Sequence, residues 1–124
     1  MNITTIPDVL GLADHSEHLT WEPFRTGIML SRVHGDPAAA PAAALLRYEP
    51  GASVPAHEHV GWEYIFVLSG SQQDDHGSYG RGSLRINPPG SRHGVTSVEG
   101  CLVLAIWERS VKFLPAPAPT VAGV

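Results

Sequence analysis

The stretch GASVPAHEHVGWEYIFVLSG, residues 51–70, carries most of the information about the fold and site of this chain. His57, His59 and Glu63 all have odd numbers, and residues two apart on an extended strand point to the same face. Two imidazoles and a carboxylate on one buried face are costly unless a partner satisfies them. A divalent metal does so, because each lone pair becomes a ligand bond. Nitrogen and oxygen donors without a thiolate fit Fe(II), Mn(II), Ni(II), Co(II) or Zn(II).

A fourth donor is available at His93, which follows the Pro-Pro-Gly turn at residues 88–90. The two prolines fix the chain direction, and Gly90 permits a turn with positive φ that would aim the next strand inward. A single histidine is more often an ordinary surface or core residue. The prediction of a metal site therefore depends on the cluster rather than on any one member.

Short strands separated by glycine or proline fill the rest of the chain. They are predicted within 21–33, where Pro23 and Gly27 interrupt, and at 45–48, 53–59, 63–68, 81–87, 93–97 and 101–108. Turns are expected at 50–51, 69–70 and 88–90. The alanine-rich segment 36–44 is expected to be a loop with a helical turn, because Pro37 and Pro41 interrupt a helix. Regularly spaced short strands predict an all-β sandwich or barrel with little helix.

The 124 residues are enough for one compact domain and too few for two ordinary ones. That domain is predicted over residues 21–114. Residues 1–20, which show no strong periodicity, are expected to form an N-terminal arm. Residues 115–124, PAPAPTVAGV, are expected to be a flexible tail rich in proline and alanine.

Composition argues against several classes of protein. The formal net charge is −4 and the basic residues are scattered, which disfavours a nucleic-acid binder. No apolar run approaches the ~20 residues of a membrane span, and the first residues do not resemble a secretion signal. The single cysteine, Cys101, permits neither an internal disulfide nor a CxxC zinc site. A cytoplasmic protein without a membrane or nucleic-acid partner is expected.

Two motifs in this chain resemble those of the cupin superfamily. Gly51-x5-His57-x-His59-x3-Glu63-x6-Gly70 matches the first cupin motif at every fixed position. Gly82-x5-Pro88-x-Gly90-x2-His93-x3-Ser97 matches the second, except that Ser97 stands where the pattern has Asn. The resemblance implies a double-stranded β-helix, or RmlC-like jelly-roll barrel. It also implies one divalent metal per chain, with iron favoured, held by His57, His59, Glu63 and His93.

Residues 45–51, 67–94 and 99–101 are similar to one branch in particular, the cupin domain of ChrR-type anti-sigma factors. The same branch includes acetylacetone-cleaving dioxygenases. A ChrR-type regulator carries a further helical sigma-binding domain with its own zinc site, for which this chain has neither the length nor the cysteines. The acetylacetone-cleaving members use three histidines without a carboxylate ligand, so Glu63 separates this chain from that exact chemistry.

The candidates for catalytic residues are Arg85, Tyr48 and His76. Arg85 shares its parity with Asn87 and could bind a carboxylate or enolate oxygen bidentately; the alternative is a solvated arginine outside the barrel. The alternative for His76 is that it lies in an exposed hairpin loop and has no role in the site. Apolar lining of the pocket is predicted from Met29, Ile65, Val67, Val95, Val103, Ala105 and Trp107.

The strand predicted at 63–68 is apolar on both faces apart from Glu63, so both faces are expected to be covered. Trp62, Tyr64, Phe66 and Leu68 share one parity and would form an outward patch. A partner subunit would cover this patch in a homodimer. The alternative cover is a helix or the N-terminal arm of the same chain.

The predicted function is a metal-dependent enzyme of the Fe(II) dioxygenase type that acts on a small carbonyl or enol compound. A non-redox metal-dependent lyase or isomerase is a variant of this hypothesis. The alternative is a non-catalytic cupin of ChrR type that binds or senses a metal or ligand without the sigma-binding domain. A structural protein with an empty site is the third possibility.

Overall fold

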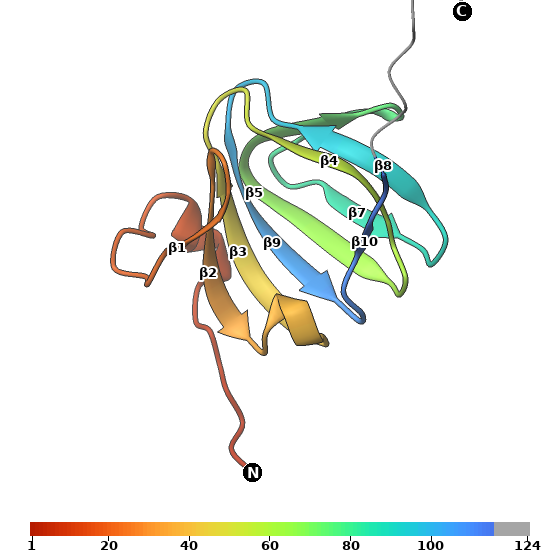
Figure 1. The fold of residues 1–124 in the computed structure, drawn as a ribbon. Coiled ribbons are helices and arrows are strands. Elements are labelled where there is room, and N and C mark those ends of the chain that lie inside the picture. The colour runs from red at the N-terminus through yellow and green to blue at the C-terminus, as the bar shows by residue number, and fades with distance from the viewer. Residues whose placement is uncertain (116–124) are drawn as a thin grey trace, which may run out of the picture.

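The computed structural model describes residues 1–115, which form an all-β barrel (Figure 1). Its strands are β1 (Glu22–Arg25), β2 (Ile28–His34), β3 (Ala42–Tyr48), β4 (Ser53–Glu58), β5 (Glu63–Asp74), β6 (Gly77–Gly80), β7 (Leu84–Asn87), β8 (Arg92–Thr96), β9 (Cys101–Trp107) and β10 (Lys112–Phe113). Two short 3-10 helices, η1 (Val9–Ala13) and η2 (Pro37–Ala39), complete the described part. Within these residues, no helix is long and apolar enough to cross a membrane.

The strands pair antiparallel in the order β1-β2-β3-β9-β5-β8-β4-β10, with β6 and β7 also paired to β5. The sheet curls so that β1, β2, β3 and β9 form one wall and β4 and β8 the other (Figure 1). The long strand β5 pairs with both walls. The predicted jelly-roll barrel is therefore confirmed.

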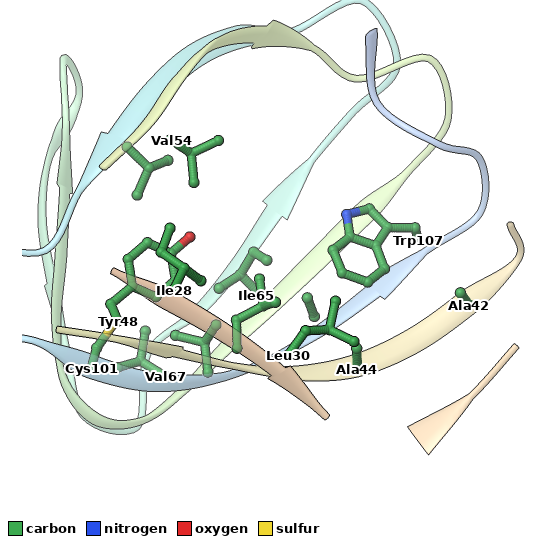
Figure 2. Close-up of a cluster of buried hydrophobic side chains, with 14 residues drawn as sticks. Ile28, Leu30, Ala42, Ala44, Tyr48, Val54, Ile65, Val67, Cys101 and Trp107 are labelled. Atoms are coloured by element: carbon green, nitrogen blue, oxygen red, sulfur yellow. The ribbon is translucent and has the colours of Figure 1, made fainter. Parts of the chain in front are cut away.

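Alternation along the strands fills the barrel with apolar side chains. Ile28 and Leu30 of β2 point inward, as do Val67 of β5 and Val103 of β9, and all four are at most 3% exposed. Figure 2 shows Trp107 and Ala42 at one end of this cluster and Tyr48 and Cys101 at the other. Met29, which alternates with these core residues, is only half-buried and is not part of the cluster. Its predicted place in the pocket lining is therefore wrong.

The predicted turn at residues 69–70 is wrong, because β5 continues through it to Asp74. The register against β9 shifts between Val67 and Ser69, which marks a bulge. Gly70 has a φ of 72°, and a Cβ there would lie 2.0 Å from the carbonyl oxygen of Gly100. Only glycine fits such a close approach. The chain turns later instead, between Asp74 and Gly77, and returns as β6, which the sequence analysis did not predict.

Two other segments also differ from the predictions. β3 begins at Ala42, inside the segment expected to be a loop, because residues from Ala42 onward pair with β9. Residues 112–113 form the edge strand β10 against β4. The predicted flexible tail lies outside the described residues apart from Pro115.

The N-terminal arm covers part of the outer face of β5. Leu12 of η1 packs with Leu45, Leu68 and Leu102 in a second apolar cluster. Leu68 is consequently 3% exposed, whereas Trp62 is 41% exposed and Tyr64 37%. Leu68 therefore does not belong to an exposed patch, since the arm of its own chain covers it.

Candidate metal centre

The four predicted ligands come together at one end of the barrel interior. His57 lies in β4, His59 follows that strand, Glu63 begins β5 and His93 lies in β8. His57 and His93 are direct partners in the antiparallel ladder, a register that sequence spacing alone does not give. All four side chains are buried, and one potential ligand atom from each lies within 4.8 Å of those from the others. The group could hold a metal ion.

The three imidazoles form a compact triangle. Their ring centroids are 5.1 Å apart for His57 and His59, and 4.8 Å apart for each of the other two pairs. The rings meet edge to face rather than stacking, with interplanar angles of 68° to 88°. Three nitrogen donors can thus converge on one point from different directions.

Each imidazole has a hydrogen-bond partner at Nδ1. His57 Nδ1 lies 2.9 Å from the carbonyl oxygen of Pro55, and His93 Nδ1 lies 2.9 Å from Asp74 Oδ2. These oxygens accept, so we assign the Nδ1–H tautomer to both rings. The Nε2 lone pairs are then left for a metal, the usual arrangement for metal-binding histidines.

Ser91 gives His59 the same Nδ1–H tautomer. The Ser91 hydroxyl donates to the carbonyl oxygen of Pro88 at 2.6 Å, so its oxygen can accept from His59 Nδ1 at 2.8 Å. The Pro-Pro-Gly turn thus orients a ligand as well as directing the strand that follows it.

Glu63 is held by donors on both oxygens. Asn87 Nδ2 donates to Oε1 at 3.0 Å, and Trp107 Nε1 donates to Oε2 at 2.6 Å. Burial alone would raise the pKa of Glu63, but the neighbouring His59 and the Trp107 hydrogen bond outweigh it and lower the pKa. The carboxylate is therefore ionised, and each oxygen keeps lone-pair capacity for a ligand bond.

One buried atom in this group has no hydrogen-bond partner. His59 Nε2 lies 3.0 Å from Glu63 Oε1, yet the two do not meet with hydrogen-bond geometry. Burial also lowers the pKa of His57, which favours a neutral ring with a free lone pair. Unshared lone pairs beside an ionised carboxylate are what a divalent cation would satisfy, so the donor set fits a metal.

Asp74 supports this site and was missed by the sequence analysis. Its side chain is only 3% exposed. Besides His93, the carboxylate accepts from the backbone N–H of His76 at 2.8 Å and from the Tyr79 hydroxyl at 3.2 Å, and Arg85 lies 3.3 Å away. Burial would raise the pKa of Asp74, but these partners, His93 first among them, lower it. An ionised Asp74 therefore orients His93.

The three catalytic candidates occupy different places. Tyr48 is buried and lines a cavity beside the metal group. Arg85 pairs with Asp74 and stacks on Tyr79 with its guanidinium carbon 3.6 Å from the ring centroid. It therefore contacts the carboxylate that orients His93. His76 is exposed in the turn between β5 and β6. Arg85 and His76 line a separate hollow on the outer side of His59 and His93.

The cavity beside the metal group holds about 50 Å³ of free space. It is lined mostly by apolar side chains, and His57, Glu63 and His93 reach it from one side. Ile65, Val95 and Trp107 line it as predicted, whereas Val67, Val103 and Ala105 lie deeper in the core. The arrangement suits a small molecule with one polar end.

The family model of the ChrR cupin-like domain matches residues 12–109. The chain belongs to the ChrR-like cupin family. No curated protein has a significantly similar sequence.

Solved structures share this cupin fold. An RmlC-like cupin from Ralstonia eutropha JMP134 is 21% identical with a TM-score of 0.72, over 89% of this chain and 75% of its own. An acetylacetone dioxygenase from Acinetobacter johnsonii is 18% identical with a TM-score of 0.72, over 100% and 85%. The anti-sigma ChrR, in complex with SigE from Rhodobacter sphaeroides, is 23% identical with a TM-score of 0.66, over 82% and 53%. This cupin thus spans about half of that last chain.

Proposed function

We propose that this cupin is a metal-dependent enzyme of the dioxygenase type that acts on a small carbonyl or enol compound. The observation that carries the proposal is the buried group of three histidines and Glu63 at the wall of a mostly apolar cavity. A redox-active divalent metal such as iron would polarise a carbonyl or enolate oxygen there and make dioxygen chemistry accessible. The likeness to the acetylacetone dioxygenase fold is compatible with this chemistry.

The residues of the chain would prepare this site in three ways. Pro55, Ser91 and Asp74 fix the rotation of the three imidazoles, and Asn87 and Trp107 fix the carboxylate. The apolar lining excludes bulk water, which strengthens electrostatic interactions inside the cavity. Tyr48 would present its protonated hydroxyl to a substrate, because burial raises its pKa well above the usual range.

The decisive experiment is elemental analysis of untagged protein purified under low oxygen, followed by oxygen-uptake assays with small diketones and aromatic ketones. Iron near one per chain together with substrate-dependent oxygen uptake is the expected result. Stoichiometric zinc or nickel without oxygen uptake would replace the proposal by a non-redox lyase or isomerase. Absence of any metal after reconstitution would overturn the metal site itself.

A sensing role of the ChrR type is the second candidate, because the family match is to that domain. Such a protein would bind a metal or ligand without turnover and would act through a partner chain. Ligand binding detected by thermal shift, with no product formed from any bound compound, would favour this role over the enzyme.

We further propose a homodimer through the outer face of β7, β5 and β9. Tyr64 pairs directly with Ile86 on one side and with Ile106 on the other, and these three side chains are 37% to 53% exposed. The double variant Tyr64→Glu/Ile86→Glu should be a monomer in sedimentation velocity. Val98→Glu, at a 68% exposed apolar position in a loop outside this face, is the control. A monomeric unmodified protein would refute the dimer.

A further inference from the structure

Two polar side chains line the cavity beside the metal group without being metal ligands or hydrogen-bond partners of those ligands. They are Tyr48 of β3 and Gln72 of β5, which are 6% and 7% exposed. The remaining lining residues outside the metal group are apolar, apart from the indole N–H of Trp107, which donates to Glu63. The wall of this cavity is therefore polar at two places only, the metal group and the pair of Tyr48 and Gln72.

The two polar places lie toward different ends of the cavity. Trp107, which is hydrogen-bonded to Glu63, lies at one end of the core cluster, and Tyr48 lies at the other end (Figure 2). In the same view the hydroxyl of Tyr48 points into the barrel interior. Gln72 reaches the cavity because the faces of β5 are exchanged by its bulge, whose register shift lies between Val67 and Ser69.

Tyr48 and Gln72 together offer a hydrogen-bond donor and an acceptor. Burial raises the pKa of both the Tyr48 hydroxyl and the Cys101 thiol, and a hydrogen bond from Gln72 acts in the opposite direction on each. We therefore assign the amide N–H side of Gln72 to these two groups, which leaves its amide oxygen as an acceptor. Tyr48 keeps its proton and is the donor. A hydroxyl group fits such a pair, because it accepts one hydrogen bond and donates another.

The charge of the cavity wall restricts the molecule that it can take. No lysine or arginine is found among the described residues that line the cavity. A carboxylate beside Tyr48 and Gln72 would thus be buried without a cation, which is costly. Binding cavities with a mostly apolar lining use their few polar groups to fix the orientation of a ligand. A neutral ligand with an oxygen function at each end matches the two polar places.

We propose that Tyr48 and Gln72 bind a hydroxyl group of the substrate, so that the substrate is a neutral molecule whose hydroxyl end and metal-binding end are joined by a small apolar body. The metal-binding end, a carbonyl or enol, rests on the proposed function. The hydroxyl end depends on Tyr48 and Gln72 alone. Such a site rejects an analogue that lacks the hydroxyl, because its own buried polar groups are then left unpaired.

The test uses three pairs of hydroxamates that share a metal-binding group and differ only at the far end. The pairs are 3-hydroxypropanohydroxamate with butanohydroxamate, 4-hydroxybutanohydroxamate with pentanohydroxamate, and 5-hydroxypentanohydroxamate with hexanohydroxamate. Both members of a pair bind the metal alike, so its contribution cancels in the ratio of their affinities. In calorimetric titrations of nickel-loaded protein, the hydroxylated member of at least one pair should bind roughly 10–100-fold more tightly. Ratios near one in all three pairs, or no binding by any hydroxamate, would overturn the proposal.

Two conservative variants assign the preference to the two side chains. Tyr48→Phe and Gln72→Met each remove a polar group at little change in volume, and each should reduce the ratio at least about fivefold. The alkyl member of the pair should bind both variants as tightly as the unmodified protein, and nickel should stay at one per chain. Tyr64→Phe, at an exposed tyrosine on the outer face of β5, should keep the full ratio. Full ratios in Tyr48→Phe and Gln72→Met would overturn the proposal.

Oxygen uptake by iron-loaded protein separates this inference from the proposed function. If the hydroxyl preference depends on Tyr48 and Gln72 but no small diketone or aromatic ketone promotes oxygen uptake, the hydroxyl site stands and the dioxygenase proposal is wrong. If such compounds promote oxygen uptake while the affinity ratios stay near one, the proposed function survives and the hydroxyl site does not.

Discussion

The two ends of the barrel interior are built from the same strands but differ in what holds them together. At the metal end, Glu63 of β5 and Trp107 of β9 are joined by a hydrogen bond. A few residues along the same strands, Val67 and Cys101 lie at the apolar end of the core and pack against apolar side chains. Directional bonds fix orientation and leave unshared lone pairs, whereas packing supplies stability without directional requirements. We therefore expect substitutions at the metal end to change ligand binding, and substitutions at the apolar end to change folding.

The largest expected effect is that of His59→Ala at the metal end. It removes the one described side chain with an unpartnered buried nitrogen, so bound metal should fall from one per chain to near zero. Added metal should raise the melting temperature of the unmodified protein by linkage and should have no such effect on the variant. Elemental analysis and thermal unfolding measure the two quantities.

His76→Ala is the matched control for this prediction, because His76 is an exposed histidine outside the metal group. It should keep full metal occupancy. Retention of stoichiometric metal by His59→Ala would show that the four residues are not the binding site.

Ile28→Ala tests the apolar end. Ile28 is 1% exposed and pairs with Tyr48 across β2 and β3, away from the histidines. The cavity it leaves should lower the free energy of unfolding by about 2–5 kcal/mol in urea titrations. Metal stoichiometry should remain unchanged. Leu84→Ala, at a position 56% exposed, should change stability by less than about 0.5 kcal/mol. Loss of metal in folded Ile28→Ala would show that the two ends are not independent.

Much of the metal end could be predicted from the sequence because its spacing is local. His57 and His59 share a strand face by parity, and the second motif places His93 after a rigid turn. The partners that orient these ligands could not be predicted in the same way. Ser91 acts from the turn before β8, and Pro55 acts from the irregular part of β4 between Val54 and His57. His93 faces His57 only because β8 pairs with β4 in one particular register.

The position of Asp74 depends on the bulge in β5. Before the bulge, Glu63, Ile65 and Val67 point inward and have odd numbers. After it, Gln72 lines the cavity and Asp74 reaches His93, and both have even numbers. A one-residue shift of this kind reverses the faces of a strand. Simple alternation would place Asp74 on the outer face with Tyr64, so parity along the strand does not predict its contact with His93.

Asp74→Asn should produce a smaller effect at the metal end. The carboxylate of Asp74 orients His93 and strengthens it as an electron-pair donor to a metal, and the amide lacks the charge to do so. Loss of such a partner typically weakens metal affinity 10–100-fold. Competition with a chelator of known affinity measures the change. Asp75→Asn, at the exposed neighbouring position, should bind metal as the unmodified protein does. Identical affinities for all three proteins would remove Asp74 from the site.

The smallest expected effect concerns the Cys101 thiol at the apolar end. Burial raises its pKa, and nearby Ser97 and Gln72 act in the opposite direction without cancelling the shift. An unfolded thiol ionises near pH 8.5, so above that pH the folded state retains a proton that the unfolded state has lost. Folding stability should therefore decline as pH rises above about 8.5, by at most about 1.4 kcal/mol per pH unit from this group. The contribution is fully present below that pH and ends where the folded thiol itself ionises.

Cys101→Ala isolates this contribution, because burial raises the pKa of Tyr48 well above its usual range and keeps it protonated in both folded proteins over this pH range. Urea unfolding at pH 7.0, 8.5 and 9.5 should show the unmodified protein losing stability relative to the variant only above pH 8.5. A constant difference across this range would mean that water reaches Cys101 in the folded state. The apolar end would then be as open as the metal end, and the contrast between the two ends would reside in their hydrogen bonds alone.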